Sequence, residues 1–224
     1  MHTINSLIKA KKWDQVSYRL CRPSRFDSEP HKLHYILFFN PPLSVIRDIT
    51  ETFPEVACEM DLMLRYPLHT ALQYGASVDI IIYLIKMNKK AVNTQDIDGK
   101  TALHHLFTHY KKRCKIQRES SYFQETIRAL CNQNRDLILK EDSNNMNVIE
   151  YAIEEEVDVR TMKFIQLAVV STIKGQDDLS WFRQSRIVSN ELDEHFTSRS
   201  KLGKAIGVMR KALSSRELNE LVCG

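Results

Sequence analysis

Histidines and a cysteine are the residues of this chain whose types and spacing come closest to a chemical site. His105 and His109 are four residues apart, so on a helix they would share one face, and Cys114 follows them. Imidazole nitrogen and thiolate sulfur are ligands that zinc accepts with tetrahedral geometry. A fourth ligand is not evident close to these three residues in the sequence. We therefore predict no metal site and no cofactor.

Three other histidines follow a regular period. His34, His69 and His104 each come directly after a leucine, and successive Leu-His pairs are 35 residues apart. A period of this length is typical of stacked supersecondary units, each of which buries its apolar face against the next. A half-buried imidazole that bonds to the backbone needs no ligand. We therefore interpret these three histidines as structural residues.

Motifs of common enzyme classes are not found. The chain has no Gly-x-Ser-x-Gly, no phosphate-binding glycine loop and no His-Glu-x-x-His. The acidic run Glu154–Glu156 is typical of a solvated helix face. We therefore expect a protein without enzymatic activity and without a small-molecule substrate.

Apolar residues repeat together with these leucines in three columns. The first column starts each unit and consists of Leu33, Leu68, Leu103 and Ile149. The second column lies 16 residues later, or 27 residues later in the third unit, and consists of Ile49, Leu84, Leu130 and Ile165. The third column lies a further seven residues on and consists of Val56, Ala91 and Leu137. An insertion of 11 residues within 109–122 explains both the longer offset and the step of 46 residues from Leu103 to Ile149.

The second unit indicates how each unit folds. Pro67 suits the first turn of a helix, and Gly75 is expected to end that helix. A second helix is predicted over Val78–Lys86, which is apolar on most sides. Asp98-Gly99 then predicts a tight turn, and Thr101 is placed to cap the next helix.

The segments Tyr66-Pro67-Leu68-His69-Thr70-Ala71 and Asp98-Gly99-Lys100-Thr101-Ala102-Leu103-His104, with Gly75, resemble the ankyrin repeat family. They are similar to its Asp-Gly turn followed by Thr-Pro-Leu-His-x-Ala. The likeness extends over about residues 1–170, although the unit at Leu33 lacks the Pro and the Ala and the unit at Ile149 lacks the His. It implies that helix pairs stack side by side, that turns project at one edge, and that the column histidines bond to backbone between repeats.

The resemblance gives the expected architecture, an all-α, ankyrin-type helical repeat solenoid with an irregular or helical C-terminal tail. Residues 1–174 would form four to five repeats, and residues 175–224 a tail that is partly helical or disordered. The repeats are predicted at about 4–29, 30–64, 65–99, 100–145 and 146–174, with the insertion at 109–122.

Composition is consistent with this plan. Six glycines and six prolines among 224 residues favour helices joined by short turns. The five cysteines are scattered, which favours a reducing compartment, so we expect an intracellular protein of the cytoplasm or nucleus. The N-terminus is not typical of a signal peptide, and the longest apolar run, Ile80–Ile85, is far short of the ~20 residues that span a membrane.

The leading hypothesis for function is a non-catalytic scaffold that binds a partner protein through repeat turns and first helices. Aromatic and arginine side chains anchor protein interfaces most often. The candidate contacts are Arg65, Tyr66, Tyr74, Gln95, Asp96, Asp98, Lys100, His105, Tyr110, Lys111, Lys112 and Arg113.

The alternative is a regulatory protein that engages nucleic acid, an anionic partner or a membrane through basic segments. The insertion is rich in Lys and Arg, and Tyr110, Tyr122 and Phe123 could stack on bases. Residues 199–213 carry five basic and no acidic residues, with apolar residues at helical spacing. The favoured interpretation is a helix that caps the last repeat, and the alternative is a basic amphipathic helix that contacts an acidic protein. A net charge of only +4 makes nucleic acid and membrane the less favoured partners.

Overall fold

The computed structural model describes residues 4–21, 32–108, 110 and 120–173, and the regular structure of these residues is helical. The α-helices are α1 Ile4–Lys9, α2 Trp13–Leu20, α4 Lys32–Phe38, α5 Leu43–Thr52, α6 Pro67–Tyr74, α7 Val78–Met87, α8 Lys90–Asn93, α9 Ala102–Phe107, α11 Ser120–Cys131, α12 Val148–Glu154 and α13 Val159–Ile173. Two 3-10 helices are η1 Pro54–Cys58 and η2 Arg135–Leu139. These described segments hold no strand, only an isolated bridge between Glu141 and Asn147. The predicted all-α class is therefore confirmed.

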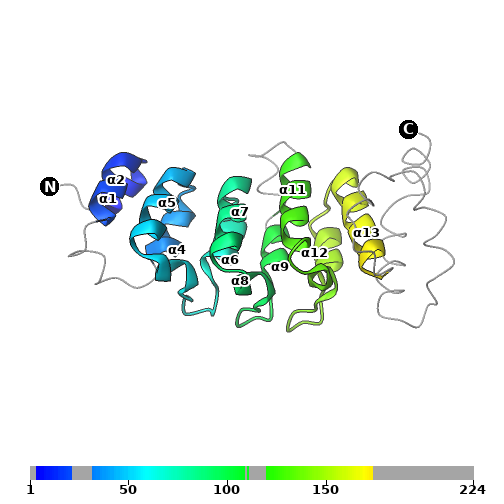
Figure 1. Cartoon of the computed structure of the whole chain (residues 1–224). Helices are drawn as coiled ribbons and strands as arrows, with labels where there is room; N and C mark the ends of the chain where they lie inside the picture. The colour runs from blue at the N-terminus through cyan, green and yellow to red at the C-terminus, as the bar shows by residue number, and fades with distance from the viewer. Residues whose placement is uncertain (1–3, 22–31, 109, 111–119, 174–224) are drawn as a thin grey trace.

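The helices lie in two rows (Figure 1). Helices α4, α6, α9 and α12 pack one against the next in the first row. Helices α2, α5, α7, α11 and α13 do the same in the second row. Each of the five sequence ranges predicted as repeats contains at least two α-helices, which in the first range are α1 and α2. None of the helices among the described residues is both long and apolar enough to cross a membrane.

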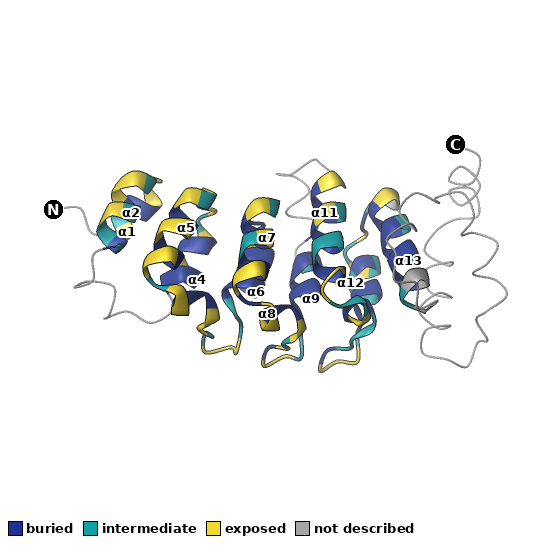
Figure 2. Ribbon diagram, viewed as in Figure 1, coloured by how far each residue is buried: buried dark blue, intermediate teal, exposed yellow. Residues whose placement is uncertain are grey.

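The three predicted apolar columns lie in the core between the rows (Figure 2). Every member of the three columns is at most 4% exposed, from Leu33 at one end to Ile165 at the other. Burying one such aliphatic side chain stabilises the fold by roughly 2 kcal/mol. The prediction that these positions form the core is confirmed.

The second unit folds as its sequence indicates. Helix α6 begins at Pro67 and ends at Tyr74, and Gly75 follows as its C-cap with a left-handed φ of 71°. Helix α7 begins at Val78 as predicted and continues one residue beyond Lys86. Thr101 precedes the first residue of α9 and occupies its N-cap position.

The predicted range of the insertion, 109–122, overlaps the start of helix α11. Helix α11 already begins at Ser120, so the predicted boundary at 122 falls within its first turn. The Tyr122 side chain is buried there, and its hydroxyl donates a hydrogen bond to the Ala76 carbonyl at 2.9 Å. Residues 109 and 111–119, and the tail from 174, lie outside the described residues.

Three turns with the same hydrogen-bonding pattern precede α6, α9 and α12. They are Asp61–Arg65, Asp96–Lys100 and Asp142–Met146. In each turn the aspartate Oδ1 accepts the backbone N–H groups two and four residues later, at 2.8–3.0 Å. The fourth residue of each turn is left-handed, and these residues are Leu64, Gly99 and Asn145, with φ of 58°, 75° and 60°.

Neighbouring turns bond to one another in a constant register. The Ile97 N–H donates to the Met63 carbonyl at 3.0 Å, and the Ser143 N–H donates to the Asp98 carbonyl at 2.9 Å. Each bond joins the second residue of one turn to the third residue of the turn before it. The turns therefore form a hydrogen-bonded row along one edge of the molecule.

Substitution of Gly99 tests whether this row of hydrogen-bonded turns stabilises the fold. Replacement of Gly99 by alanine would place a Cβ 2.7 Å from the Ser143 nitrogen and at a φ of +75°. We expect the free energy of unfolding to fall by about 3 kcal/mol, because left-handed strain adds to a weakened bond between turns. Urea denaturation measures this change. Leu64→Gly at the equivalent position of the first turn is the control, and it should be neutral or stabilising; equal losses from both variants would contradict this account.

Candidate partner-binding surface

The three column histidines join neighbouring units through the backbone. The Nε2 atom of each imidazole lies at hydrogen-bond distance from a backbone carbonyl in the segment that leads to the next helix pair. The acceptors for His34, His69 and His104 are Glu59, Thr94 and Met146, at 3.2, 3.0 and 3.2 Å. The expectation that these histidines bond to backbone is confirmed.

All three imidazoles have both ring nitrogens at hydrogen-bond distance from a partner, and for His34 the second partner is the Thr70 hydroxyl, 2.7 Å from Nδ1. The Nδ1 of His69 accepts the Tyr66 N–H at 3.2 Å, and that of His104 accepts the Thr101 N–H at 3.1 Å. Because Nδ1 accepts, the single proton of the neutral ring lies on Nε2 and is donated to the carbonyl. Burial lowers the pKa of both His69 and His104 to about 4, so both rings are neutral at neutral pH.

Asp96 and His105 form a buried pair, contrary to their predicted place at the binding surface. Asp96 is 7% exposed and His105 is 4% exposed, and Asp96 Oδ2 lies 2.8 Å from His105 Nε2. Burial alone would raise the pKa of Asp96, but hydrogen bonds from His105 and from the turn amides hold it below its ordinary value. The pair holds the turn to α9, and neither side chain is accessible to a partner.

Tyr110 is also buried, contrary to its predicted place at the binding surface. Its hydroxyl donates to the Asp158 carboxylate and accepts the Asp158 N–H at 3.3 Å. Tyr122 and Phe123 are buried as well. None of these three aromatic rings is accessible for stacking on bases, because Tyr110 packs against Phe123 and the Tyr122 hydroxyl bonds the Ala76 carbonyl in the interior. The predicted contacts Lys111, Lys112 and Arg113, and the basic segment 199–213, lie outside the described residues.

The other predicted contacts are accessible and lie on the turns or on α6. They are Arg65, Tyr66, Tyr74, Gln95, Asp98 and Lys100. Arg65 is fixed by Asp61, whose Oδ2 lies 2.7 Å from one guanidinium nitrogen. Lys100 lies over the Tyr151 ring, 5.7 Å from its centroid. Tyr74 is 40% exposed at the end of α6. These six residues are therefore available at the molecular surface.

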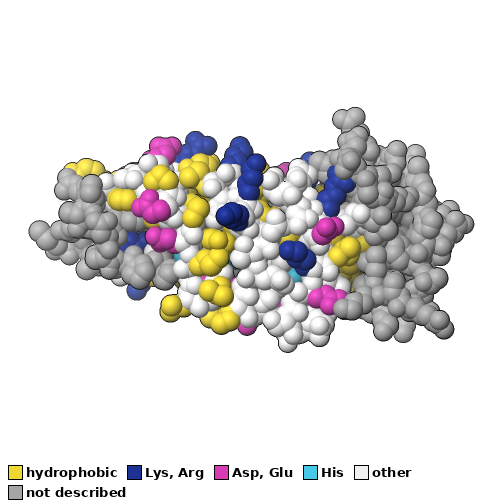
Figure 3. Space-filling view, turned by 60° about the horizontal axis from the view of Figure 1, so that its bottom comes forward, with side chains coloured by type: hydrophobic (Ala, Val, Ile, Leu, Met, Phe, Trp, Pro, Cys, Tyr) yellow, Lys and Arg dark blue, Asp and Glu magenta, His cyan; other side chains and the backbone are white. Residues whose placement is uncertain are grey.

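A group of exposed apolar side chains lies on one face of the molecule, and sequence reasoning did not identify it (Figure 3). We use the name apolar surface for the exposed large apolar residues of α4, of α6 and of the turns before α6 and α9, which are Tyr35, Phe38, Leu62, Met63, Leu64, Tyr74 and Ile97. The rings of Phe38 and Tyr74 meet edge to face, with centroids 4.7 Å apart, and connect α4 to α6. The backbone bond between Met63 and Ile97 connects the turn residues. The turn before α6 is joined to the end of α6 by the Arg65 guanidinium, which donates to the Gln73 side chain at 2.8 Å.

The sequence did contain a signal for this surface. Asp61, Asp96 and Asp142 are 35 and 46 residues apart, the same steps as those of the first apolar column. Aligned on these aspartates, the first turn reads Leu-Met-Leu where the others read Ile-Asp-Gly and Ser-Asn-Asn. Turn positions are normally polar or glycine. Three consecutive apolar residues at this position indicate a surface made for contact.

Leu64 gives this surface a further unusual feature. It has a left-handed φ of 58° and is 50% exposed, and its neighbour Leu62 is 89% exposed. A left-handed backbone costs a residue with a Cβ about 1–2 kcal/mol, and a solvated leucine returns little of that by burial. Strain of this kind at an exposed position is a basis for a functional hypothesis.

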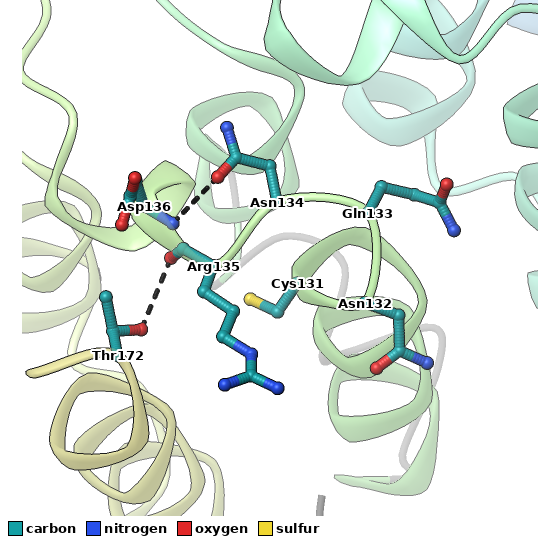
Figure 4. Close-up of a pocket in the computed structure, with 7 residues that line it drawn as sticks. All are labelled: Cys131, Asn132, Gln133, Asn134, Arg135, Asp136 and Thr172. Carbon is teal, nitrogen blue, oxygen red and sulfur yellow. Dashed lines mark hydrogen bonds between the residues drawn. The ribbon is translucent and has the colours of Figure 1, made fainter. Parts of the chain in front are cut away.

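A polar pocket lies elsewhere, between the end of α11, η2 and α13 (Figure 4). Its lining residues are Cys131, Asn132, Gln133, Asn134, Arg135, Asp136 and Thr172. The Asn134 side chain accepts the Asp136 N–H at 3.0 Å, and the Thr172 hydroxyl donates to the Arg135 carbonyl at 3.4 Å. Burial raises the pKa of Cys131 to about 12, so its thiol stays protonated and is a poor nucleophile. These lining groups stabilise a helix junction.

Metal ligands do not gather in the part of the chain that the structure describes, where no group of three or more His, Cys, Asp and Glu residues could hold an ion. His109 and Cys114, two of the three residues considered for zinc, lie outside it. No protein-family model matches the chain, and no curated protein sequence matches it. A proposal for function therefore depends on the surface described above.

Proposed function

We propose that this protein is a non-catalytic scaffold of the ankyrin-repeat type, which binds a partner protein through its turns and first-row helices. The observation that carries the proposal is the apolar surface on the hydrogen-bonded row of turns. Contiguous exposed apolar groups with a polar rim mark protein interaction sites. A turn such as Asp61–Arg65, already fixed by its own hydrogen bonds, loses little conformational freedom when a partner binds.

The repeat assignment is supported by features that recur from unit to unit. The column histidines bond to the backbone of the segment that follows them, and the turn aspartates accept the same pair of amides in three turns. The helices pack in two rows in sequence order. Such nearest-neighbour packing is the arrangement expected of a repeat protein.

The candidate contacts fall into an apolar group and a polar group. Tyr35, Phe38 and Tyr74 supply aromatic area, and Leu62 and Leu64 project from the turn. Arg65, Gln95, Asp98 and Lys100 lie around them as a polar rim. Residues in the apolar centre dominate affinity in most interfaces, whereas rim charges chiefly affect association rate and specificity.

The double variant Leu62→Asp with Leu64→Asp tests the proposal. We expect it to reduce capture of partner proteins from the native cell extract by about tenfold or more. The reason is that two exposed apolar side chains at the proposed contact are replaced by charged ones. Aspartate tolerates the left-handed backbone at residue 64 better than leucine does, so the fold should be retained. Quantitative affinity capture with the full chain measures the loss, and circular dichroism checks the fold.

Ile82→Asp is the matched control, since Ile82 is an exposed apolar residue of α7 in the second row. Proteins lost with the double variant should be retained with Ile82→Asp. If both variants capture the same proteins as the parent chain, the apolar surface is not the binding site and the proposal fails.

A further inference from the structure

We propose that the apolar surface and the acidic end of the same face bind residues 199–213 of this chain, so that the tail competes with the partner. The inference depends on the proposed function, because it assigns that same surface a regulatory occupant. It concerns a contact within one chain, and it makes partner binding dependent on release of the tail.

The ends of the first-row helices change from aromatic to acidic along the row. Helix α4 ends at Phe38 and α6 ends at Tyr74, both exposed apolar residues. Helix α12 ends at Glu154, which is exposed and is followed by two further glutamates. Asp98 adds an exposed carboxylate in the turn between α6 and α9. A ligand that matches this face needs apolar side chains and positive charge together.

Residues 199–213 have that combination. The segment carries Arg199, Lys201, Lys204, Arg210 and Lys211 with no acidic residue. Leu202, Ile206, Met209 and Leu213 recur at helical spacing, so the sequence predicts one apolar face on a basic helix. Basic amphipathic helices bind apolar grooves with acidic surroundings, and charge complementarity selects the register.

The length of a helix over residues 199–213 matches the span of the first-row helices. A helix of this length is about 22 Å long at 1.5 Å per residue. Three neighbouring first-row helices, α6, α9 and α12, span about 20 Å at usual interhelical distances of 8–10 Å. A helix lying along the row would therefore reach from Tyr74 to Glu154.

The connecting chain is long enough to permit this contact. About 25 residues, 174–198, separate α13 from the basic segment, and a flexible chain of this length has a root-mean-square span of about 28 Å. This span exceeds the distance of about 20 Å from α12 back to α6. A tether that is long enough to cross the distance between two sites gives an effective concentration in the millimolar range. Even a weak site would then be occupied by the tail.

A labelled peptide of residues 199–213 tests the inference by fluorescence anisotropy at low salt. The comparison uses the full chain and a tail-reversed full chain with Lys201→Glu, Lys204→Glu and Arg210→Glu. We expect the peptide to bind the tail-reversed chain about tenfold more tightly, because the tail of the unmodified chain already occupies the site. Equal affinity for both chains, or no binding to the tail-reversed chain, would overturn the inference.

Variants of the face locate the peptide. Added to the tail-reversed chain, Leu64→Asp should weaken peptide binding about tenfold and Glu154→Lys about threefold, as expected for a central and a rim contact. Ile82→Asp on the second row should leave peptide binding unchanged. If Leu64→Asp does not weaken peptide binding, the tail binds at another site and the inference is overturned.

Two further results separate the alternatives. Sedimentation of the unmodified chain should show a monomer; a dimer that dissociates on tail reversal would mean that the tail binds a second copy, contrary to the proposal. Partner capture distinguishes the inference from the proposed function. If the peptide fails to bind but the Leu62→Asp, Leu64→Asp variant still loses its partners, the inference is wrong and the scaffold function stands.

Discussion

Replacement of Asp96 by alanine is expected to lower the free energy of unfolding by about 4 kcal/mol. The carboxylate accepts the N–H groups of Asp98 and Lys100 through Oδ1 and bonds His105 through Oδ2. Hydrogen bonds to a buried charged group contribute about 1.5–3 kcal/mol each, and their loss leaves two amides and an imidazole poorly satisfied. Urea denaturation of the full chain measures the change.

Asp98→Ala is the control for this prediction, because Asp98 is exposed and lies in the same turn. Its removal should change the free energy of unfolding by less than about 0.5 kcal/mol. The loss in free energy of unfolding for Asp96→Asn should lie between those for Asp96→Ala and Asp98→Ala. An amide oxygen can still accept hydrogen bonds from the backbone N–H groups of the turn. If Asp96→Ala is no more destabilising than Asp98→Ala, the buried carboxylate does not hold the turn as described.

Acid is expected to destabilise the protein between pH 6.5 and about 4 through His69 and His104. Burial lowers the pKa of each to about 4 from an ordinary value of 6.5. The unfolded chain takes up these protons as the pH falls below 6.5, whereas the folded chain does not, so folding loses stability over this range. The loss is on the order of 3 kcal/mol for each histidine, and the full stability is present above pH 6.5.

Nuclear magnetic resonance titration of the histidine ring protons checks the cause directly. The His69 and His104 signals should remain those of the neutral ring until the pH is near 4, or until the protein unfolds. Urea denaturation across the same pH range should show the loss of stability. Ordinary titration of both rings near pH 6.5 would show that Nδ1 does not serve as a buried acceptor, and would contradict the prediction.

Local sequence patterns predicted much of the fold. Pro67, Gly75 and the apolar run from Val78 gave a helix pair whose ends the structure places within one residue. These signals are local, because a proline, a glycine and a helical stripe act within one or two turns of backbone. The core columns were predictable too, since apolar residues at a fixed period must bury the same face of each unit.

The candidate site was predicted only in part. Asp96 and His105 looked like surface residues because polar side chains near a turn are usually solvated, yet they bond each other in the interior. Tyr110 was assigned to a basic loop, but it packs beside Phe123 with ring centroids 4.5 Å apart. These outcomes depend on partners 9 to 48 residues away, which local pattern does not identify.

The sequence by itself determined the period, the helices and the apolar columns of this protein. Backbone preference and the burial of repeated apolar positions are properties of each unit, so they can be read along the chain. Only the tertiary structure decided that Asp96 is buried and that Leu62 and Leu64 are exposed. The exposure of a turn side chain depends on the turn stacked beside it, and Met63 and Ile97 meet only when two units pack together.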